Sequence, residues 1–145
     1  MYDSKCYLTA AEFSKLMNRV GPFETAPHIA VAVSGGSDSL ALCLLVADWA
    51  RKRKGLVTAI TIDHGLRPES SIEAKQVSLW MRQQKIEHKT IHWTGIKPKT
   101  GIQAAARLAR LRLLVDWCIE HSVIHLLTGH QLEDQAGTVL LRLSS

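Results

Sequence analysis

Six small or polar residues at the end of an apolar run form the stretch of this sequence best suited to chemistry. Residues 29–33 read Ile-Ala-Val-Ala-Val, and a helical pattern begins near Ser37. A buried strand that leads into a helix in this way leaves free backbone N–H groups at the positive end of the helix dipole. We therefore predict an anion site that binds phosphate. It is made of Ser34, Gly35, Gly36, Ser37, Asp38 and Ser39.

Asp38 is the one carboxylate in this turn. Beside bound phosphates its charge is repulsive unless a cation lies between them, so its simplest role is that of a Mg²⁺ ligand. The turn has no lysine and does not have the spacing of the common nucleotide-binding loops. A serine and glycine turn that only caps a helix is the alternative, and the flanking strand and helix favour the phosphate interpretation.

The composition predicts a single globular domain. The chain has 145 residues, 46% of them hydrophobic, and residues 1–27 are expected to form a leading helix and a linker. No apolar run is long enough to span a membrane and the N-terminus does not resemble a secretory signal, so we expect a cytoplasmic protein. The net charge of +5 favours a polyanionic partner. Cys43 and Cys118 lie on apolar helix faces and are expected to be core thiols.

Strands and helices are expected to alternate along the rest of the chain. A short helix starts at the capping box of Thr9 and Glu12 and ends at Gly21. Strands are predicted at residues 29–33, 56–62, 88–93 and 123–129, with helices between them and a final helix from about Asp134. This pattern predicts an α/β fold, a doubly wound parallel sheet of at least four strands with its ligand at their carboxyl ends.

Two more polar loops follow predicted strands. Residues 63–70 read Asp-His-Gly-Leu-Arg-Pro-Glu-Ser, and in the simplest interpretation Gly65 makes the turn and Ser70 caps the next helix. The loop after the last strand carries Gly129, His130 and Asp134. Asp134 can reach the same Mg²⁺ as Asp38 if the first and last strands are neighbours.

The long helix that begins near residue 101 carries two arginines, Arg107 and Arg110, one turn apart. Their planar guanidinium groups suit phosphate oxygens, although a solvated basic face fits the spacing equally well. A different face is predicted to be the buried stripe of this helix. It consists of Ala104, Leu108, Leu111, Val115 and Cys118.

Taken in order, these stretches resemble the N-terminal catalytic domain of the tRNA(Ile)-lysidine synthetases, which belong to the PP-loop ATP pyrophosphatases. The Ser-Gly-Gly-x-Asp-Ser loop, the 63–70 signature, the Ala-Arg-x-x-Arg stretch and the Gly-His-x-x-x-Asp-Gln element carry the resemblance. Leu111, Glu133 and Gly137 depart from the usual Tyr, Asp and Glu. The resemblance implies a fold of the adenine nucleotide alpha hydrolase-like type.

The resemblance also implies an activity. It implies an enzyme that uses ATP to adenylate the C2 oxygen of the wobble cytidine in tRNA(Ile) with a CAU anticodon. Free L-lysine then displaces AMP to form lysidine. The implied ATP-binding residues are Ser34, Gly35, Gly36, Ser37, Asp38, Ser39, Asp63, His64 and Gly129. The implied catalytic residues are Asp38, Arg107, Arg110, His130 and Asp134, of which Asp38 and Asp134 would hold Mg²⁺.

Two alternatives stay open. A tRNA pyrimidine 2-thiolating relative also adenylates C2, but such enzymes typically carry paired cysteines, which this sequence does not have. The chain is also compatible with a catalytic-domain fragment that binds ATP without completing the reaction, since the C-terminal tRNA-binding regions of the family are not in it. No membrane partner is expected, and a homodimer is one option for its assembly.

Overall fold

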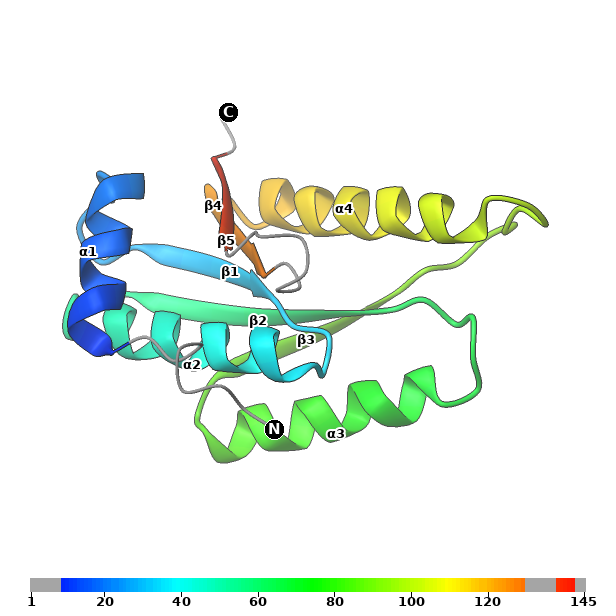
Figure 1. Cartoon of the computed structure of the whole chain (residues 1–145), viewed down its shortest axis with the longest axis horizontal. Coiled ribbons are helices and arrows are strands. Elements are labelled where there is room, and N and C mark those ends of the chain that lie inside the picture. Colours follow the sequence, from blue (N-terminus) through cyan, green and yellow to red (C-terminus); the bar gives the residue numbers. More distant parts are fainter. Residues whose placement is uncertain (1–8, 130–137, 143–145) are drawn as a thin grey trace.

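A computed structural model describes residues 9–129 and 138–142 of the chain, without the side chains of residues 37, 38, 129 and 138–142. Four helices and five strands make up the described part (Figure 1). The helices are α1 (Ala10–Val20), α2 (Ser37–Lys52), α3 (Ser70–Gln83) and α4 (Ile102–Glu120). The strands are β1 (His28–Ala32), β2 (Leu56–Asp63), β3 (Glu87–His92), β4 (His125–Gly129) and β5 (Thr138–Arg142).

The strands form one sheet in the order β3-β2-β1-β4-β5. The first four strands are parallel, and β1 lies between β2 and β4, so that Val31 is paired with Ala59 on one side and with Leu127 on the other. This arrangement confirms the predicted parallel sheet. It also brings the carboxyl ends of β1, β2 and β4 together at one edge, where ligands bind in open α/β sheets.

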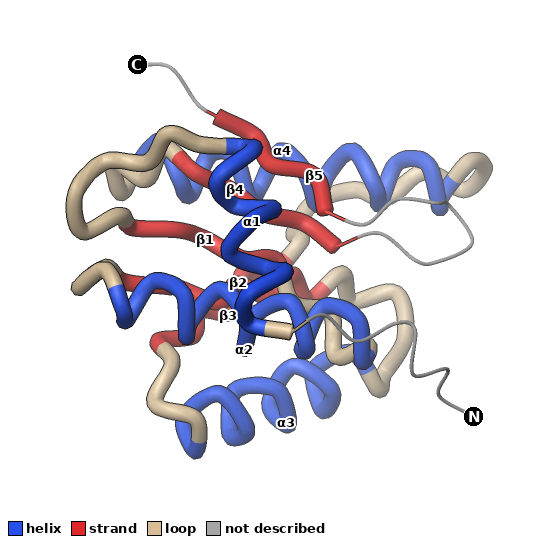
Figure 2. Tube along the Cα trace, turned by 60° about the vertical axis from the view of Figure 1, so that its left-hand side comes forward, coloured by secondary structure: helices blue, strands red, loops and turns tan. Residues whose placement is uncertain are grey.

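Helices cover both faces of the sheet. Figure 1 shows α2 and α3 on one side, α4 on the other, and α1 beside the amino ends of the strands; Figure 2 shows α1 crossing that end of the molecule. Side chains of β1 alternate between the two cores: Ile29 and Val31 pack with α2 and α3, whereas Ala30 and Ala32 pack with α4. Small residues on the α4 side let this helix lie close to the sheet.

The predicted final helix is wrong for residues 138–142, which form the antiparallel strand β5 against β4. Thr138 and Val139 are β-branched and two leucines follow them, a composition with high strand propensity. Pairing with β5 also satisfies backbone groups that β4 would otherwise present at the edge of the sheet. The register joins Thr128 to Val139.

The predicted buried stripe of α4 is also largely wrong. Leu108 is 71% exposed and Leu111 is 42% exposed, and Ala104 is exposed as well. The buried residues are Leu114, Trp117 and Cys118, all in the second half of the helix, because the first turns of α4 extend past the end of β1 (Figure 1). Apolar spacing alone could not reveal which part of this helix has a sheet beneath it.

The start of α1 confirms the predicted helix start, with Thr9 as its N-cap. Thr9 is the N-cap residue, and the backbone N–H of Glu12 donates a hydrogen bond of 3.1 Å to the Thr9 hydroxyl. Phe13 and Met17, one turn apart, are buried against α2, so this helix closes the core at the amino end of the sheet.

Candidate functional site

The loop between β1 and α2 has the geometry of an anion site. Val33 still belongs to the buried sheet, since its N–H donates to the Ile60 carbonyl at 2.9 Å, whereas the next three residues are exposed. Gly35 has a φ of +90°, a conformation that favours glycine. Gly36 is the N-cap of α2 and has no side chain to cap the helix. The first N–H groups of α2 are therefore not capped by the residue that precedes them, and they can bind an anion.

Ser39 supports this loop from inside the fold. Its hydroxyl accepts a hydrogen bond from the Ser34 N–H at 3.1 Å and donates one to the Gly36 carbonyl at 3.1 Å. It also lies 3.2 Å from the Ser34 hydroxyl, and Ser39 is buried. These contacts favour a bracing role for Ser39 over direct contact with a ligand. The exposed Ser34 is the better placed of the two hydroxyls for such contact.

A cleft of about 570 Å³ opens beside the loop, with Ser34, Gly35 and Gly36 on one side and α3 on the other. α3 was not identified from the sequence as a wall of this cleft. Its residues Glu73, Gln76, Val77 and Trp80 share one helix face, and only that periodicity indicated it. The carboxylate of Glu73 is paired with the guanidinium of Arg67 at 3.2 Å, which offsets a negative charge that would otherwise repel phosphate.

Asp63, the last residue of β2, is held by three donors. Its Oδ1 accepts from the Ser70 hydroxyl at 2.5 Å and from the Gly65 N–H at 3.1 Å, and its Oδ2 lies 3.3 Å from Nδ1 of His92. Asp63 is 6% exposed, and its pKa is lowered, chiefly by the hydrogen bond from Ser70. The carboxylate is therefore ionised and fixes the shape of the loop that follows β2.

Ser70 does not cap α3, which rules out that part of the simplest interpretation of this loop. Glu69 occupies the N-cap position and Ser70 is the first residue of the helix, where its hydroxyl is committed to Asp63. Ser70 is already inside the helix, one residue past the cap, and its hydroxyl donates a strong charge-assisted hydrogen bond to the buried carboxylate instead of accepting one from a backbone N–H. His64 also organises the loop, because its Nδ1 accepts the Leu66 N–H at 3.0 Å, which places the proton of the neutral ring on Nε2.

The two arginines of α4 lie one turn apart on the helix, as predicted, but they differ in exposure. Arg107 is exposed, whereas Arg110 is half-buried on the same side of the helix as Leu114 and Trp117. Burial lowers the pKa of Arg110, and no carboxylate pairs with it in the part of the chain that the structure describes. A half-buried guanidinium without a partner favours an anionic ligand.

His130 and Asp134 lie outside the described residues, as does the side chain of Asp38. Within residues 9–129 and 138–142, no group of three His, Cys, Asp or Glu side chains could hold a metal ion. The Mg²⁺ site therefore stays a prediction. Gly129 is the last residue of β4, which is paired in parallel with β1. Gly129 therefore lies at the same edge of the sheet as the loop between β1 and α2.

Comparison with known proteins places these features in a family. A model of the PP-loop domain matches residues 7–145. The chain belongs to the PP-loop family. The predicted fold class is confirmed. The Ser-Gly-Gly-Ser-Asp-Ser turn of residues 34–39 is the candidate for the phosphate-binding loop of this domain and is called the PP-loop.

The resemblance to the lysidine synthetases is confirmed by curated relatives of this PP-loop chain. It is 47% identical to the tRNA(Ile)-lysidine synthase of Orientia tsutsugamushi over 131 residues, which are 90% of the chain and 30% of the relative. It is 49% identical to that of Rhodopseudomonas palustris over 124 residues, 84% of the chain and 36% of the relative. The chain thus spans about a third of the length of these relatives.

A solved structure shares the fold. The U34-tRNA thiolase NcsA from Methanococcus maripaludis, which contains a [4Fe-4S] cluster, superimposes with a TM-score of 0.69 at 21% identity. The match covers 77% of the chain and 41% of the thiolase. Among the described residues, no helix has the length and apolar character needed to cross a membrane.

Proposed function

We propose that this PP-loop domain catalyses the ATP-dependent attachment of L-lysine to C2 of the wobble cytidine in tRNA(Ile) with a CAU anticodon. The observation that carries the proposal is the uncapped, glycine-lined start of α2 in a chain whose curated relatives are named tRNA(Ile)-lysidine synthases. In this reaction the cytidine oxygen is adenylated with release of pyrophosphate, and the lysine amine then displaces AMP.

The described residues have separate roles in the proposed binding of ATP. The uncapped backbone N–H groups at the start of α2 hold the phosphates at the positive end of the helix, and Ser39 keeps the preceding loop in shape. Asp63 fixes the loop that carries His64 and Gly65. Arg110 stabilises the charge that develops at the α-phosphate. Fixed donors of this kind act without rearranging during the reaction, which is why they favour the transition state.

Asp38 and Asp134 are the carboxylates proposed to hold Mg²⁺, which would neutralise the departing pyrophosphate. Carboxylate oxygens are the ligands that this cation prefers. His130 is proposed to contact phosphate or to position the nucleophile. These three assignments rest on the resemblance and on the place of the residues in the sequence.

The buried thiols favour lysine ligation over thiolation. Burial raises the pKa of Cys43 to about 12 and that of Cys118 to about 11, so neither thiol supplies a thiolate at neutral pH. The prediction that they are core thiols is confirmed. A sulfur-transfer reaction needs a reactive cysteine or a bound cluster, and Cys43 and Cys118 are unsuited to both roles.

The test is incorporation of radiolabelled lysine into tRNA(Ile) with a CAU anticodon, in the presence of ATP and Mg²⁺. We expect incorporation by the chain and its loss in an Asp38→Ala variant. Mg²⁺-dependent ATP binding without incorporation would instead assign the chain as the nucleotide-binding part of a longer enzyme. Absence of both would overturn the proposal. The reaction belongs in the cytoplasm, where tRNA, ATP and lysine are available.

A further inference from the structure

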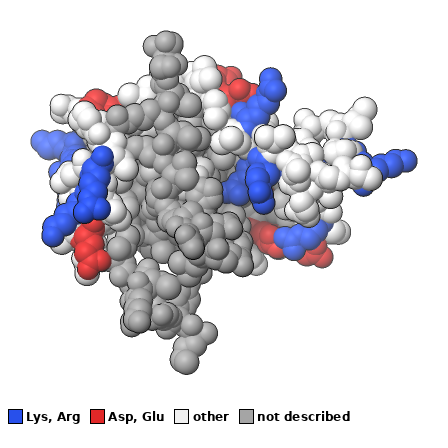
Figure 3. Space-filling model, turned by 45° about the horizontal axis from the view of Figure 1, so that its top comes forward, with Lys and Arg blue, Asp and Glu red and all other residues white. Residues whose placement is uncertain are grey.

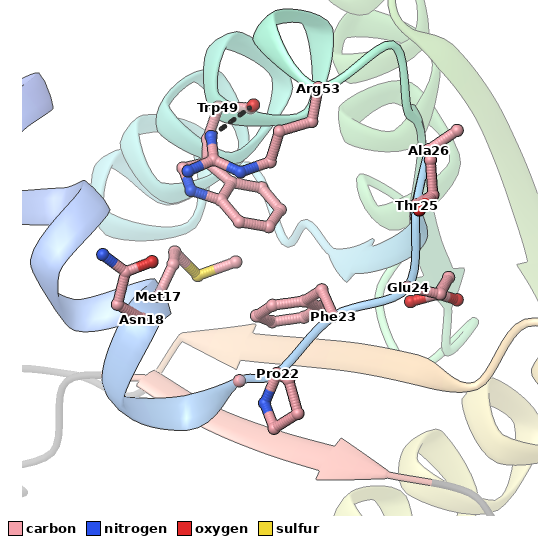
Figure 4. Close-up of a pocket in the computed structure, with 10 residues that line it drawn as sticks. Met17, Asn18, Pro22, Phe23, Glu24, Thr25, Ala26, Trp49 and Arg53 are labelled. Carbon is pink, nitrogen blue, oxygen red and sulfur yellow. Dashed lines mark hydrogen bonds between the residues drawn. The ribbon is translucent and has the colours of Figure 1, made fainter.

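A second cavity, of about 600 Å³, lies at the opposite edge of the sheet from the PP-loop (Figure 4). It is formed by the end of α1, the segment of residues 21–26 and the last turn of α2. These elements sit at the amino ends of the strands, whereas the PP-loop follows the carboxyl end of β1. Its volume falls in the range of small-ligand sites, roughly 300–1,000 Å³. Nothing in the proposed ligation chemistry uses it.

One wall of this cavity is a stack of planar groups. The guanidinium carbon of Arg53 lies 4.1 Å from the centre of the Trp49 ring, and its Nη1 donates to the Trp49 carbonyl at 3.3 Å. Phe23 meets the Trp49 ring edge to face, with centroids 4.9 Å apart. Trp49 is only 5% exposed, so the half-buried Arg53 presents the planar surface of the stack to a ligand. A guanidinium fixed on an indole ring is already in the orientation that stacks on a nucleobase.

The opposite wall offers hydrogen-bonding groups, and it is also fixed in place. Oε1 of Glu24 lies 2.6 Å from Nε2 of the buried His125, and the ring of Phe23 packs on His125 at 4.6 Å. Oε2 of Glu24 remains available to accept a hydrogen bond, and the Asn18 side chain lies at the rim. A carboxylate acceptor suits the exocyclic amine of cytosine or adenine, which uracil does not have.

The charges around the cavity suit a phosphate backbone. Arg51, Lys52 and Lys54 are exposed beside Arg53 at the end of α2. Lys52 is paired with Asp48 at 3.2 Å, whereas Arg53 has no carboxylate partner among the described residues. Figure 3 shows basic side chains, with acidic ones beside them, on the left and on the right of the face that it presents. The amino edge therefore has its own positive charge, apart from that of the PP-loop edge.

We propose that the cavity between α1, residues 21–26 and the end of α2 binds one unpaired nucleotide of an RNA, with its base stacked on Arg53. The N–H groups at the edge of the same guanidinium meet the phosphate, and Glu24 meets the base edge. The choice of RNA as the partner rests on the proposed function. The site is separate from the reacting cytidine, because it lies at the other edge of the sheet.

The test compares two arginines that are two residues apart. Binding of fluorescently labelled tRNA(Ile) to the 145-residue chain is measured by anisotropy for Arg53→Gln and for Arg51→Gln. Each variant removes one positive charge from the end of α2, but only Arg53 lines the cavity. We expect Arg53→Gln to weaken binding about tenfold, the effect of one stacked base, and Arg51→Gln to weaken it less than about twofold. The difference should persist as the salt concentration rises, because stacking is less sensitive to salt than charge is.

Arg53→Lys keeps the charge without the planar group, so it should bind as weakly as Arg53→Gln. Thermal unfolding and ATP binding of each variant show whether it is folded. Equal losses for Arg51→Gln and Arg53→Gln would overturn the proposal, as would the absence of RNA binding up to roughly 100 μM protein, the weak end of non-specific affinity. Binding of free CMP or AMP that is lost in Arg53→Gln, with RNA binding unaffected by the same substitution, would overturn RNA as the partner. Lysine incorporation is a separate measurement, so the two proposals can fail independently.

Discussion

The Ser70 hydroxyl lies 2.5 Å from Oδ1 of Asp63, and this contact ties the first residue of α3 to the last residue of β2. The loop between these two residues carries His64 and Gly65, so one hydrogen bond closes the loop at its base. Because Asp63 is buried and ionised, the contact contributes to the stability of the fold as well as to the shape of the site.

The first prediction concerns the removal of this hydroxyl. Ser70→Ala should lower the free energy of unfolding at pH 7 by about 1.5–3 kcal/mol, because a buried carboxylate loses its strongest donor. Ser71→Ala is the matched control, since Ser71 is exposed one position further along the same helix. Urea denaturation of both variants measures the effect. Equal stability of the two variants would show that the Asp63 contact contributes little.

The second prediction is the pH dependence of the same contact. The pKa of Asp63 is lowered in the folded state, so its stabilising contribution is complete above the unfolded value of about 3.9 and is lost as pH falls through the folded value. The difference in unfolding free energy between the parent chain and Ser70→Ala should therefore be constant from neutral pH to about pH 5 and shrink below about pH 4. Urea denaturation across this range measures it. A difference that grows on acidification would contradict the assignment of an ionised Asp63.

The third prediction separates backbone strain from ligand binding in the PP-loop. Gly35→Ala and Gly95→Ala place a side chain at φ values of +90° and +105°, so each should cost about 1–3 kcal/mol of stability. A Cβ at either position meets no atom closer than 3.5 Å, so neither variant has a steric clash. Only Gly35 lies in the PP-loop. We expect ATP affinity to fall at least tenfold in Gly35→Ala, about 1.4 kcal/mol, and to be unchanged in Gly95→Ala by equilibrium dialysis. Equal ATP affinities of Gly35→Ala and Gly95→Ala would show that the PP-loop does not contact ATP.

Much of this architecture was predictable from local pattern. The β1 to α2 junction, the N-cap at Thr9 and the strand at β2 each depend on residues that are neighbours in the sequence, and the structure has all three. The role of Ser70 was not predictable in this way, because its partner is seven residues earlier and the competing helix cap is a common local solution.

The features that the sequence did not predict depend on how the helices and strands pack against one another. Leu108 and Leu111 have the spacing of a buried stripe, but the sheet lies under another part of α4, and the face toward it carries Arg110. Residues 138–142 have both helical and strand character, and the open edge of β4 selects the strand. The wall of α3 beside the PP-loop likewise depends on how two helices pack on the same side of the sheet, which spacing within either helix does not specify.

The fourth prediction follows from the different environments of the α4 arginines. Arg110→Met should leave stability unchanged or raise it by up to about 1 kcal/mol, because it replaces a half-buried, unpaired charge with an apolar chain of similar length. It should nevertheless reduce lysine incorporation about 100-fold, the effect of losing one charged group that stabilises the transition state. Arg107→Met, at the exposed position, should change unfolding by less than about 0.5 kcal/mol. Loss of activity in Arg107→Met alone would assign the phosphate contact to the exposed arginine.

The fifth prediction tests the buried thiols with a thiol-specific reagent. The pKa values of about 12 and about 11 for Cys43 and Cys118 leave almost no thiolate at pH 8, and both side chains are buried. In a Cys6→Ser variant, Ellman's reagent should therefore label neither cysteine in the native chain and both after unfolding in guanidinium chloride. The rate of labelling in the native state then reports opening of the two cores that flank the sheet, since Cys43 lies in one and Cys118 in the other. Fast labelling of Cys118 but not of Cys43 would mean that α4 separates from the sheet more readily than α2, whereas fast labelling of both at pH 8 would contradict their burial.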